Sequence, residues 1–74
     1  MPKIERKWRR VGDPRVGFTY IGLNGRPLSN PAAIRRINSL AIPPAWVDVE
    51  IDPDPAAKVQ ALGFDTAGRK QYRY

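Results

Sequence analysis

The spacing of apolar and polar residues divides this chain into short strands and one helix. Four runs have the aromatic, β-branched or alternating composition of strands, namely residues 17–21, 47–51, 58–64 and 69–74. In the second run, alternation predicts that Val47, Val49 and Ile51 face a core. Asp48 and Glu50 are predicted to face outward, so this strand is expected to bury only one face.

Turn signals separate these strands. Asn24-Gly25 accepts the positive φ angles of a tight hairpin, so the chain is predicted to return through residues 26–28 as a short edge strand. A second turn is predicted before the last strand, where Gly68 is placed to take the left-handed position. Both turns favour antiparallel pairing.

A single helix is predicted after residue 30. Asn30 or Ser29 can cap the free N–H groups of its first turn, and Pro31 suits the first helical position. Helical spacing gives an apolar face of Ile34, Ile37, Leu40 and Ala41, opposite Arg35, Arg36 and Asn38. Pro43 is expected to end the helix. The sum is an α+β fold, a small antiparallel sheet of four to five strands with one packed helix.

Residues 1–16 are predicted to form a basic arm, flexible or loosely ordered, ahead of a single domain over residues 17–74. The arm carries cations around Trp8 and contains the turn signal Asp13-Pro14. Trp8 is equally suited to stacking on a base and to covering the sheet.

The composition excludes several classes of site. The 74 residues contain no cysteine and no histidine, which excludes disulfides and the usual zinc sites. The commonest acid–base residue near neutral pH is therefore missing, and we expect no self-contained hydrolase. No apolar run approaches the ~20 residues of a membrane-spanning helix, and the charged N-terminus is not followed by the apolar segment of a secretory signal.

The net charge of +6 is distributed unevenly. Residues 1–36 carry nine basic and two acidic groups, residues 37–64 carry one and four, and residues 65–74 carry three and one. The two cationic ends suit a polyanionic partner. A solvated surface explains the same charges, so composition supports nucleic-acid binding and no binding about equally.

Three features that look like catalytic or metal sites have simpler explanations. A hard cation could use the acidic run Asp48, Glu50, Asp52 and Asp54, but a solvated strand face accounts for it better. Residues 63–68 superficially resemble a phosphate loop, but Arg69-Lys70 follows instead of Lys and Ser or Thr, and no helix comes next. The tyrosines have no activating neighbours in sequence. We therefore expect no metal, no cofactor and no catalytic residue.

The C-terminal strand carries the strongest candidate binding site, formed by Arg69, Lys70, Gln71, Tyr72, Arg73 and Tyr74. Arg and Lys neutralise phosphates, Gln can bond adenine in the major groove, and Tyr can contact phosphate or sugar. Alternation puts Lys70, Tyr72 and Tyr74 on one face and Gln71 and Arg73 on the other, and one of these faces could be core. Further candidate phosphate contacts are Lys7, Arg9 and Arg10.

Three segments in register closely resemble the N-terminal domain of type IB DNA topoisomerases of the bacterial and poxvirus kind. They are LAIPPAWVDV at residues 40–49, QALGFD at residues 60–65 and GRKQYRY at residues 68–74. The resemblance covers roughly residues 17–74. Val47 stands where bacterial sequences commonly have Thr, and Phe64 where they commonly have Arg, which could weaken one phosphate contact.

The resemblance implies one half of a clamp around duplex DNA. In this family the small N-terminal lobe lies over the major groove. A larger catalytic lobe, outside this chain, carries the tyrosine that forms a 3′-phosphotyrosyl link and relaxes supercoils without ATP or metal. Carried onto this chain, residues 68–74 contact DNA, with Gln71, Tyr72 and Tyr74 at the matching positions.

The resemblance thus implies a non-catalytic DNA-binding domain whose partners are duplex DNA and the catalytic domain of the same polypeptide. It implies a monomer in the bacterial cytoplasm, at the nucleoid, with no membrane contact. Two other classes stay open. A single-stranded RNA- or DNA-binding module would use Tyr72 and Tyr74 for stacking, whereas an interaction domain would use the apolar helix face and bind no nucleic acid.

Overall fold

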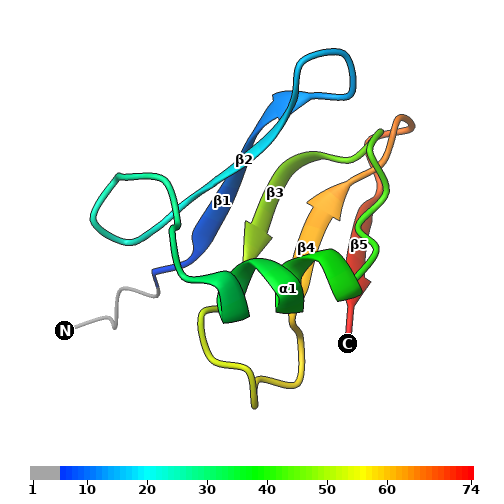
Figure 1. Ribbon diagram of the computed structural model, residues 1–74. Coiled ribbons are helices and arrows are strands. Elements are labelled where there is room, and N and C mark those ends of the chain that lie inside the picture. Colours follow the sequence, from blue (N-terminus) through cyan, green and yellow to red (C-terminus); the bar gives the residue numbers. More distant parts are fainter. Residues whose placement is uncertain (1–5) are drawn as a thin grey trace, which may run out of the picture.

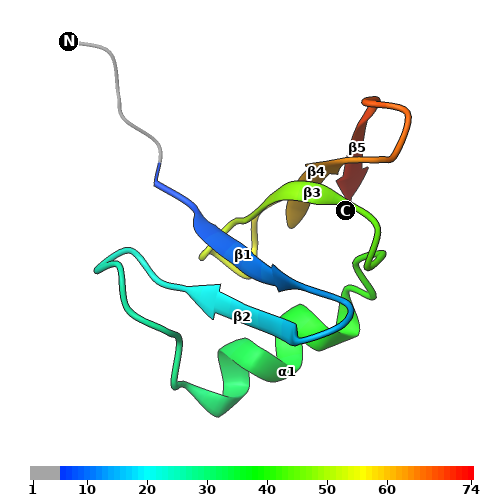
Figure 2. The same cartoon turned by 90° about the horizontal axis from the view of Figure 1, so that it is seen from above.

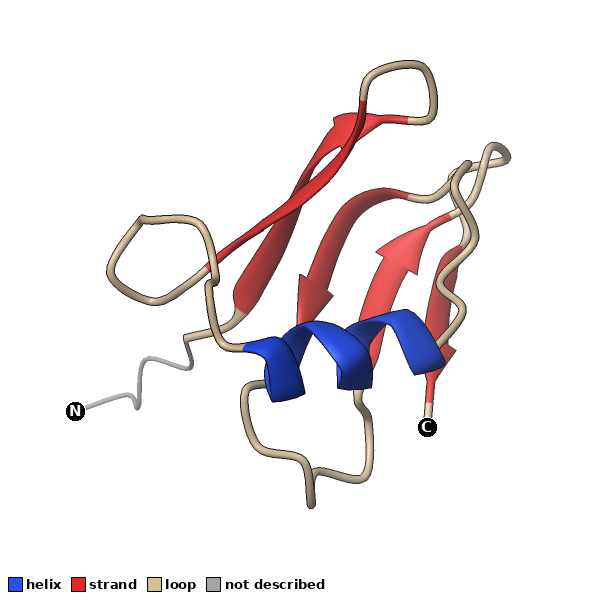
Figure 3. Cartoon of the chain, viewed as in Figure 1, coloured by secondary structure: helices blue, strands red, loops and turns tan. Residues whose placement is uncertain are grey.

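Five strands form one antiparallel sheet with a helix across it in the computed structural model, which describes residues 6–74 (Figures 1 and 3). The elements are β1 (Trp8–Asp13), β2 (Gly17–Ile21), α1 (Pro31–Ser39), β3 (Val47–Ile51), β4 (Ala61–Phe64) and β5 (Lys70–Arg73). The strand order is β2-β1-β3-β4-β5, and every neighbouring pair is antiparallel. The predicted α+β fold is confirmed.

The core lies between α1 and one face of the sheet, which we call the helix face (Figure 2). Its centre is Ile37 of α1 against Val49, Ile51 and Ala61, each at most 2% exposed. The residues packed around this centre are Trp8, Tyr20, Leu28, Leu40, Ile42 and Trp46. The opposite face of the sheet, which we call the open face, packs against no helix among residues 6–74.

α1 begins where the sequence predicts. The Asn30 side-chain oxygen accepts hydrogen bonds from the Ala32 and Ala33 amides at 2.9 and 3.3 Å, which satisfies two of the free donors at a helix start. The helix ends at Ser39, before Pro43. Ala41 is exposed with a φ of 51°, so its expected place on the apolar face is wrong.

β1 corrects the expectation of a loosely ordered arm. Residues 9–13 pair with β2, and Trp8 and Arg9 pair with β3, so β1 is an interior strand of the sheet. Trp8 packs against the core, which decides between its two predicted roles in favour of covering the sheet. Residues 1–5 of the predicted arm lie outside the described residues.

β3 departs from simple alternation at its start. Val49 and Ile51 are buried as predicted, but Val47 is 57% exposed. The register shifts between Val47 and Glu50, and Asp48 has a φ of 51°. A bulge of this kind rotates the preceding side chain out of the alternating pattern, so the prediction that Val47 faces the core is wrong.

The remaining boundaries differ from the sequence expectation in length. The turn at Asn24-Gly25 is present, but the returning segment makes a single bridge between Ile21 and Pro27 rather than a strand. The predicted strand over residues 58–64 shortens to β4, and the last strand runs only from Lys70 to Arg73. Gly68 takes the left-handed conformation with a φ of 78°, as expected.

Candidate nucleic-acid interface

The strand register aligns one residue from each strand in a row across the open face. Ile21 pairs with Arg9, Arg9 with Glu50, Glu50 with Leu62, and Leu62 with Tyr72. These residues alternate with the core residues of their strands, so their side chains leave the sheet on the side away from α1. The open face thus combines an exposed cation, a carboxylate, two aliphatic residues and an aromatic residue.

β5 is an edge strand, and its candidate site residues are divided between the two faces. Lys70, Tyr72 and Tyr74 are exposed, the two tyrosines by 42% and 75%. Gln71 and Arg73 alternate with them and are half-buried on the helix face. The structure therefore gathers three of the predicted residues on the open face and places two behind the same strand.

The open-face side chains of β5 contact one another. The Lys70 ammonium lies 5.7 Å from the centre of the Tyr72 ring. The rings of Tyr72 and Tyr74 are 6.2 Å apart between centroids, at an interplanar angle of 34°. An aromatic surface beside a cation can stack on a base or sugar while the cation contacts phosphate.

Arg73 is held within the protein. Its guanidinium donates to the Ala41 carbonyl at 3.1 Å and lies 5.8 Å from the Trp46 ring. Its Nε atom is buried and has no hydrogen-bond partner among the described residues. These contacts tie β5 to the segment that follows α1.

The turn before β5 is organised by one carboxylate. Asp65 Oδ1 accepts from the Ala67 and Arg69 amides, both at 2.9 Å. Its Oδ2 accepts from Arg69 Nε and from Gln71 Nε2, both at 3.0 Å. These hydrogen bonds lower the pKa of Asp65, and the bond from the Arg69 amide contributes most. The carboxylate is therefore ionised at neutral pH.

The three basic residues expected as further phosphate contacts have different surroundings. Arg9 is exposed on the open face. Lys7 donates to Asp52 at 2.6 Å and lowers the pKa of that carboxyl. The Arg10 guanidinium lies 4.0 Å from the Phe18 ring and donates to carbonyls after α1, with burial lowering its pKa.

Arg36 was predicted to lie away from the core, and this prediction is wrong. Its guanidinium donates to the Asp52 carbonyl at 2.6 Å and to the Gln60 side-chain oxygen, and it lies 5.4 Å from the Trp8 ring. Gln60 is itself only 8% exposed. Sequence reasoning missed this cluster because its members are far apart along the chain.

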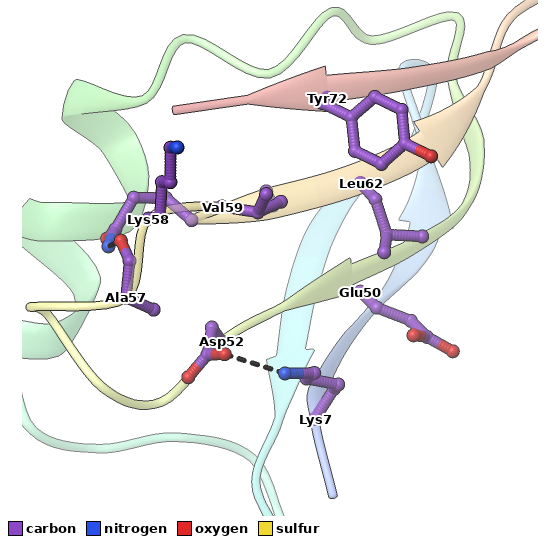
Figure 4. A pocket seen from close by; sticks show the side chains of 10 residues that line it. Lys7, Glu50, Asp52, Ala57, Lys58, Val59, Leu62 and Tyr72 are labelled. Atoms are coloured by element: carbon purple, nitrogen blue, oxygen red, sulfur yellow. Dashed lines mark hydrogen bonds and ion pairs between the residues drawn. The ribbon is translucent and has the colours of Figure 1, made fainter. Parts of the chain in front are cut away.

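A pocket of about 290 Å³ opens beside Tyr72 on the open face (Figure 4). Leu62 and Val59 form part of its apolar wall, and the Lys7–Asp52 ion pair closes one side. No group of His, Cys, Asp and Glu within residues 6–74 is arranged to hold a metal ion. Within the same residues, no helix has the length and apolar character needed to cross a membrane.

Comparison with known proteins identifies the family. Residues 17–65 match the family model of the bacterial DNA topoisomerase IB N-terminal domain, which is more than half of the chain. The chain belongs to this family. The topoisomerase IB domain is 58% identical over 57 residues to DNA topoisomerase 1B of Acanthamoeba polyphaga mimivirus, covering 77% of this chain but only 17% of that relative. No solved structure matches the domain. The resemblance found in the sequence is thereby confirmed.

Proposed function

We propose that this topoisomerase IB N-terminal domain binds duplex DNA through β5, the turn before β5 and Arg9, the exposed cation of β1 on the open face. It serves as the non-catalytic half of a clamp, and the catalytic domain of the same polypeptide cuts one strand through a 3′-phosphotyrosyl link and relaxes supercoils. The proposed partners are therefore duplex DNA and that catalytic domain, in a monomer at the bacterial nucleoid.

The observation that carries the proposal is the division of the basic side chains into two groups. Arg10, Arg36 and Arg73 donate to carbonyl or amide oxygens within the fold. Arg9 and Lys70 are exposed on the open face, and neither donates a side-chain hydrogen bond to another group within residues 6–74, so they remain available for phosphates. A fold that binds three guanidinium groups internally while Arg9 and Lys70 stay exposed on the open face suits a polyanion at that face.

The dimensions of the interface also suit a duplex. Arg9 and Tyr72 are three strand spacings apart in the row across the sheet, which is about 14 Å at ~4.8 Å per spacing. The major groove is about 12 Å wide and admits a two-stranded ribbon. The β4–β5 ribbon can therefore enter the groove while Arg9 reaches a phosphate at its border.

A binding comparison tests the proposal. Fluorescence anisotropy at low salt should give tighter binding to a labelled duplex than to either of its single strands. Gln71→Ala should weaken binding to the preferred duplex by about 1–3 kcal/mol, because Gln71 is the candidate base-reading residue. An unchanged affinity would remove Gln71 from the interface.

Single-stranded nucleic acid is the second candidate partner, because Tyr72 and Tyr74 expose neighbouring rings. Stacking on aromatic side chains typically contributes about 1–3 kcal/mol per base. If this function is the right one, the chain will prefer single strands, and Tyr72→Ala and Tyr74→Ala will abolish that preference. If no nucleic acid binds even at low salt, a protein-interaction domain is the better description.

A further inference from the structure

The Asp65 carboxylate contacts Gln71, the residue that the proposed function assigns to base reading, at the β4–β5 turn toward which the Gln71 side chain extends from the helix face of β5. Figure 1 shows the β4–β5 turn at the end of the sheet opposite the loop that joins β3 to β4. Asp65 begins this turn, and its Oδ2 is 3.0 Å from both Arg69 Nε and Gln71 Nε2. The two nitrogens share one oxygen, so they can be no more than about 6 Å apart. That is under two base steps of ~3.4 Å along a strand.

The charge of Asp65 dictates which way the Gln71 amide is turned. An ionised carboxylate only accepts hydrogen bonds, so the amide must present its NH2 group to Asp65. Its Oε1 and one N–H then remain for another partner. Adenine offers the complementary pair in the major groove, an N6 donor and an N7 acceptor.

The same oxygen restricts the Arg69 guanidinium. Its Nε is bonded to Asp65, and the side chain as a whole is 75% exposed. The two terminal nitrogens therefore stay available to solvent. A guanidinium fixed at Nε keeps the fork that can contact a phosphate, or guanine O6 and N7.

We propose that Asp65 is a positioning residue for base recognition, which fixes the Gln71 amide in the orientation that reads an amino-bearing base and steadies the Arg69 guanidinium beside it. This inference rests on the proposed function, because it concerns duplex DNA at the β4–β5 turn. Asp65 itself contacts no base.

Asp65→Asn separates this role from the structural one. Asparagine keeps an Oδ1 that accepts from the Ala67 and Arg69 amides, so the turn is retained. Its NH2 replaces Oδ2 and cannot accept from Arg69 Nε or Gln71 Nε2. The Gln71 amide is then expected to rotate and turn its own NH2 outward, which favours bases that present acceptors.

Two measurements test the positioning role. In the free chain, the Gln71 side-chain NH2 should exchange slowly with water by NMR, and Asp65→Asn should accelerate that exchange. Selection from randomised duplexes should reveal a base-pair position whose preference is lost in Gln71→Ala. At that position, Asp65→Asn should reduce discrimination between adenine and the other bases by about tenfold, measured under conditions in which the variant is fully folded.

Asp54→Asn is the matched control, since Asp54 also caps a turn, through the Ala56 amide, but at the end of the sheet opposite the β4–β5 turn. It removes the same charge and should leave discrimination unchanged. The inference is overturned if Asp65→Asn keeps full discrimination, if its Gln71 NH2 exchange matches wild type, or if Gln71→Ala alters no position. Failure of the wild-type chain to bind any duplex would instead overturn the proposed function, and the inference with it.

Discussion

Replacing Arg36 by alanine should destabilise the fold without weakening DNA binding by the folded chain. Arg36 joins α1 to the loop between β3 and β4 through the Asp52 carbonyl and the Gln60 side chain. Its guanidinium also lies near the Trp8 ring on the helix face. Arg36→Ala therefore removes donors that two half-buried or buried acceptors depend on, whereas the open face keeps all its cations.

The size of this loss of stability follows from the two acceptors that lose their donor. A hydrogen bond to a charged group contributes about 1.5–3 kcal/mol, and a buried acceptor left unpaired costs about 1–3 kcal/mol. Gln60 keeps its amide bonds to loop carbonyls, so its oxygen bears most of this cost. We expect a loss of about 2–4 kcal/mol, from a total of about 4–11 kcal/mol for a chain of this length.

The assay is urea unfolding followed by tryptophan fluorescence, with duplex affinity measured where the variant is fully folded. Arg35→Ala is the control, because Arg35 is the exposed neighbour of the same charge on the same helix and its loss should change stability by under about 0.5 kcal/mol. Equal stability of the two variants would refute the structural role of Arg36. Weaker DNA binding by folded Arg36→Ala than by Arg35→Ala would refute the division between structural and DNA-facing cations.

Three further predictions concern Lys70 of β5, the Lys7–Asp52 pair and Gly12 of β1. Lys70→Ala should weaken binding to all duplexes alike and reduce the slope of log affinity against log salt by about 1, and a full slope would exclude Lys70 as a phosphate contact. The Asp52 pKa is lowered chiefly by the Lys7 hydrogen bond, so the stabilisation is present above the unfolded pKa of about 4 and is lost as pH falls through the lower folded value. Stability measured across this range should depend less on pH in Asp52→Asn, and identical curves would contradict the ion pair. Gly12→Ala should cost about 2–4 kcal/mol, because its φ is 102° and a Cβ there would lie 2.2 Å from the Gly17 carbonyl oxygen; Gly25→Ala, with a φ of 77° and no atom within 4 Å of its Cβ, should cost less in the same urea assay.

Much of the fold follows from local sequence signals. The bounds of β2, the Asn30 cap of α1 and the left-handed Gly68 all match their predictions, because each depends on residues within one turn or strand. The burial of Val49 and Ile51 follows from alternation for the same reason.

No local sequence signal of this kind marks β1 as a strand. Its helix-face positions include Arg10, a charged residue that normally indicates solvent. Arg10 is accommodated there because its guanidinium meets the Pro43 and Trp46 carbonyls, more than thirty residues away along the chain. Arg36 is a similar case, since its acceptors belong to the loop between β3 and β4.

The sequence predicted which segment forms the candidate site, but it did not predict which of its side chains share an exposed surface. The sequence identified Arg69–Tyr74, and alternation already divided its side chains between two faces. It could not indicate which face packs on α1, because both carry cations and polar residues. The role of Asp65 was also missed, although an aspartate three residues before a turn glycine is a known signal for side-chain capping of the turn.

The most direct test of DNA binding is a titration of the isotope-labelled chain with a short duplex at low salt, followed through backbone amide NMR shifts. We expect shifts concentrated in residues 68–74 and around Arg9, with little change along α1. Absence of any shift at millimolar duplex, or shifts centred on α1, would contradict the proposal that β5 and the open face meet DNA.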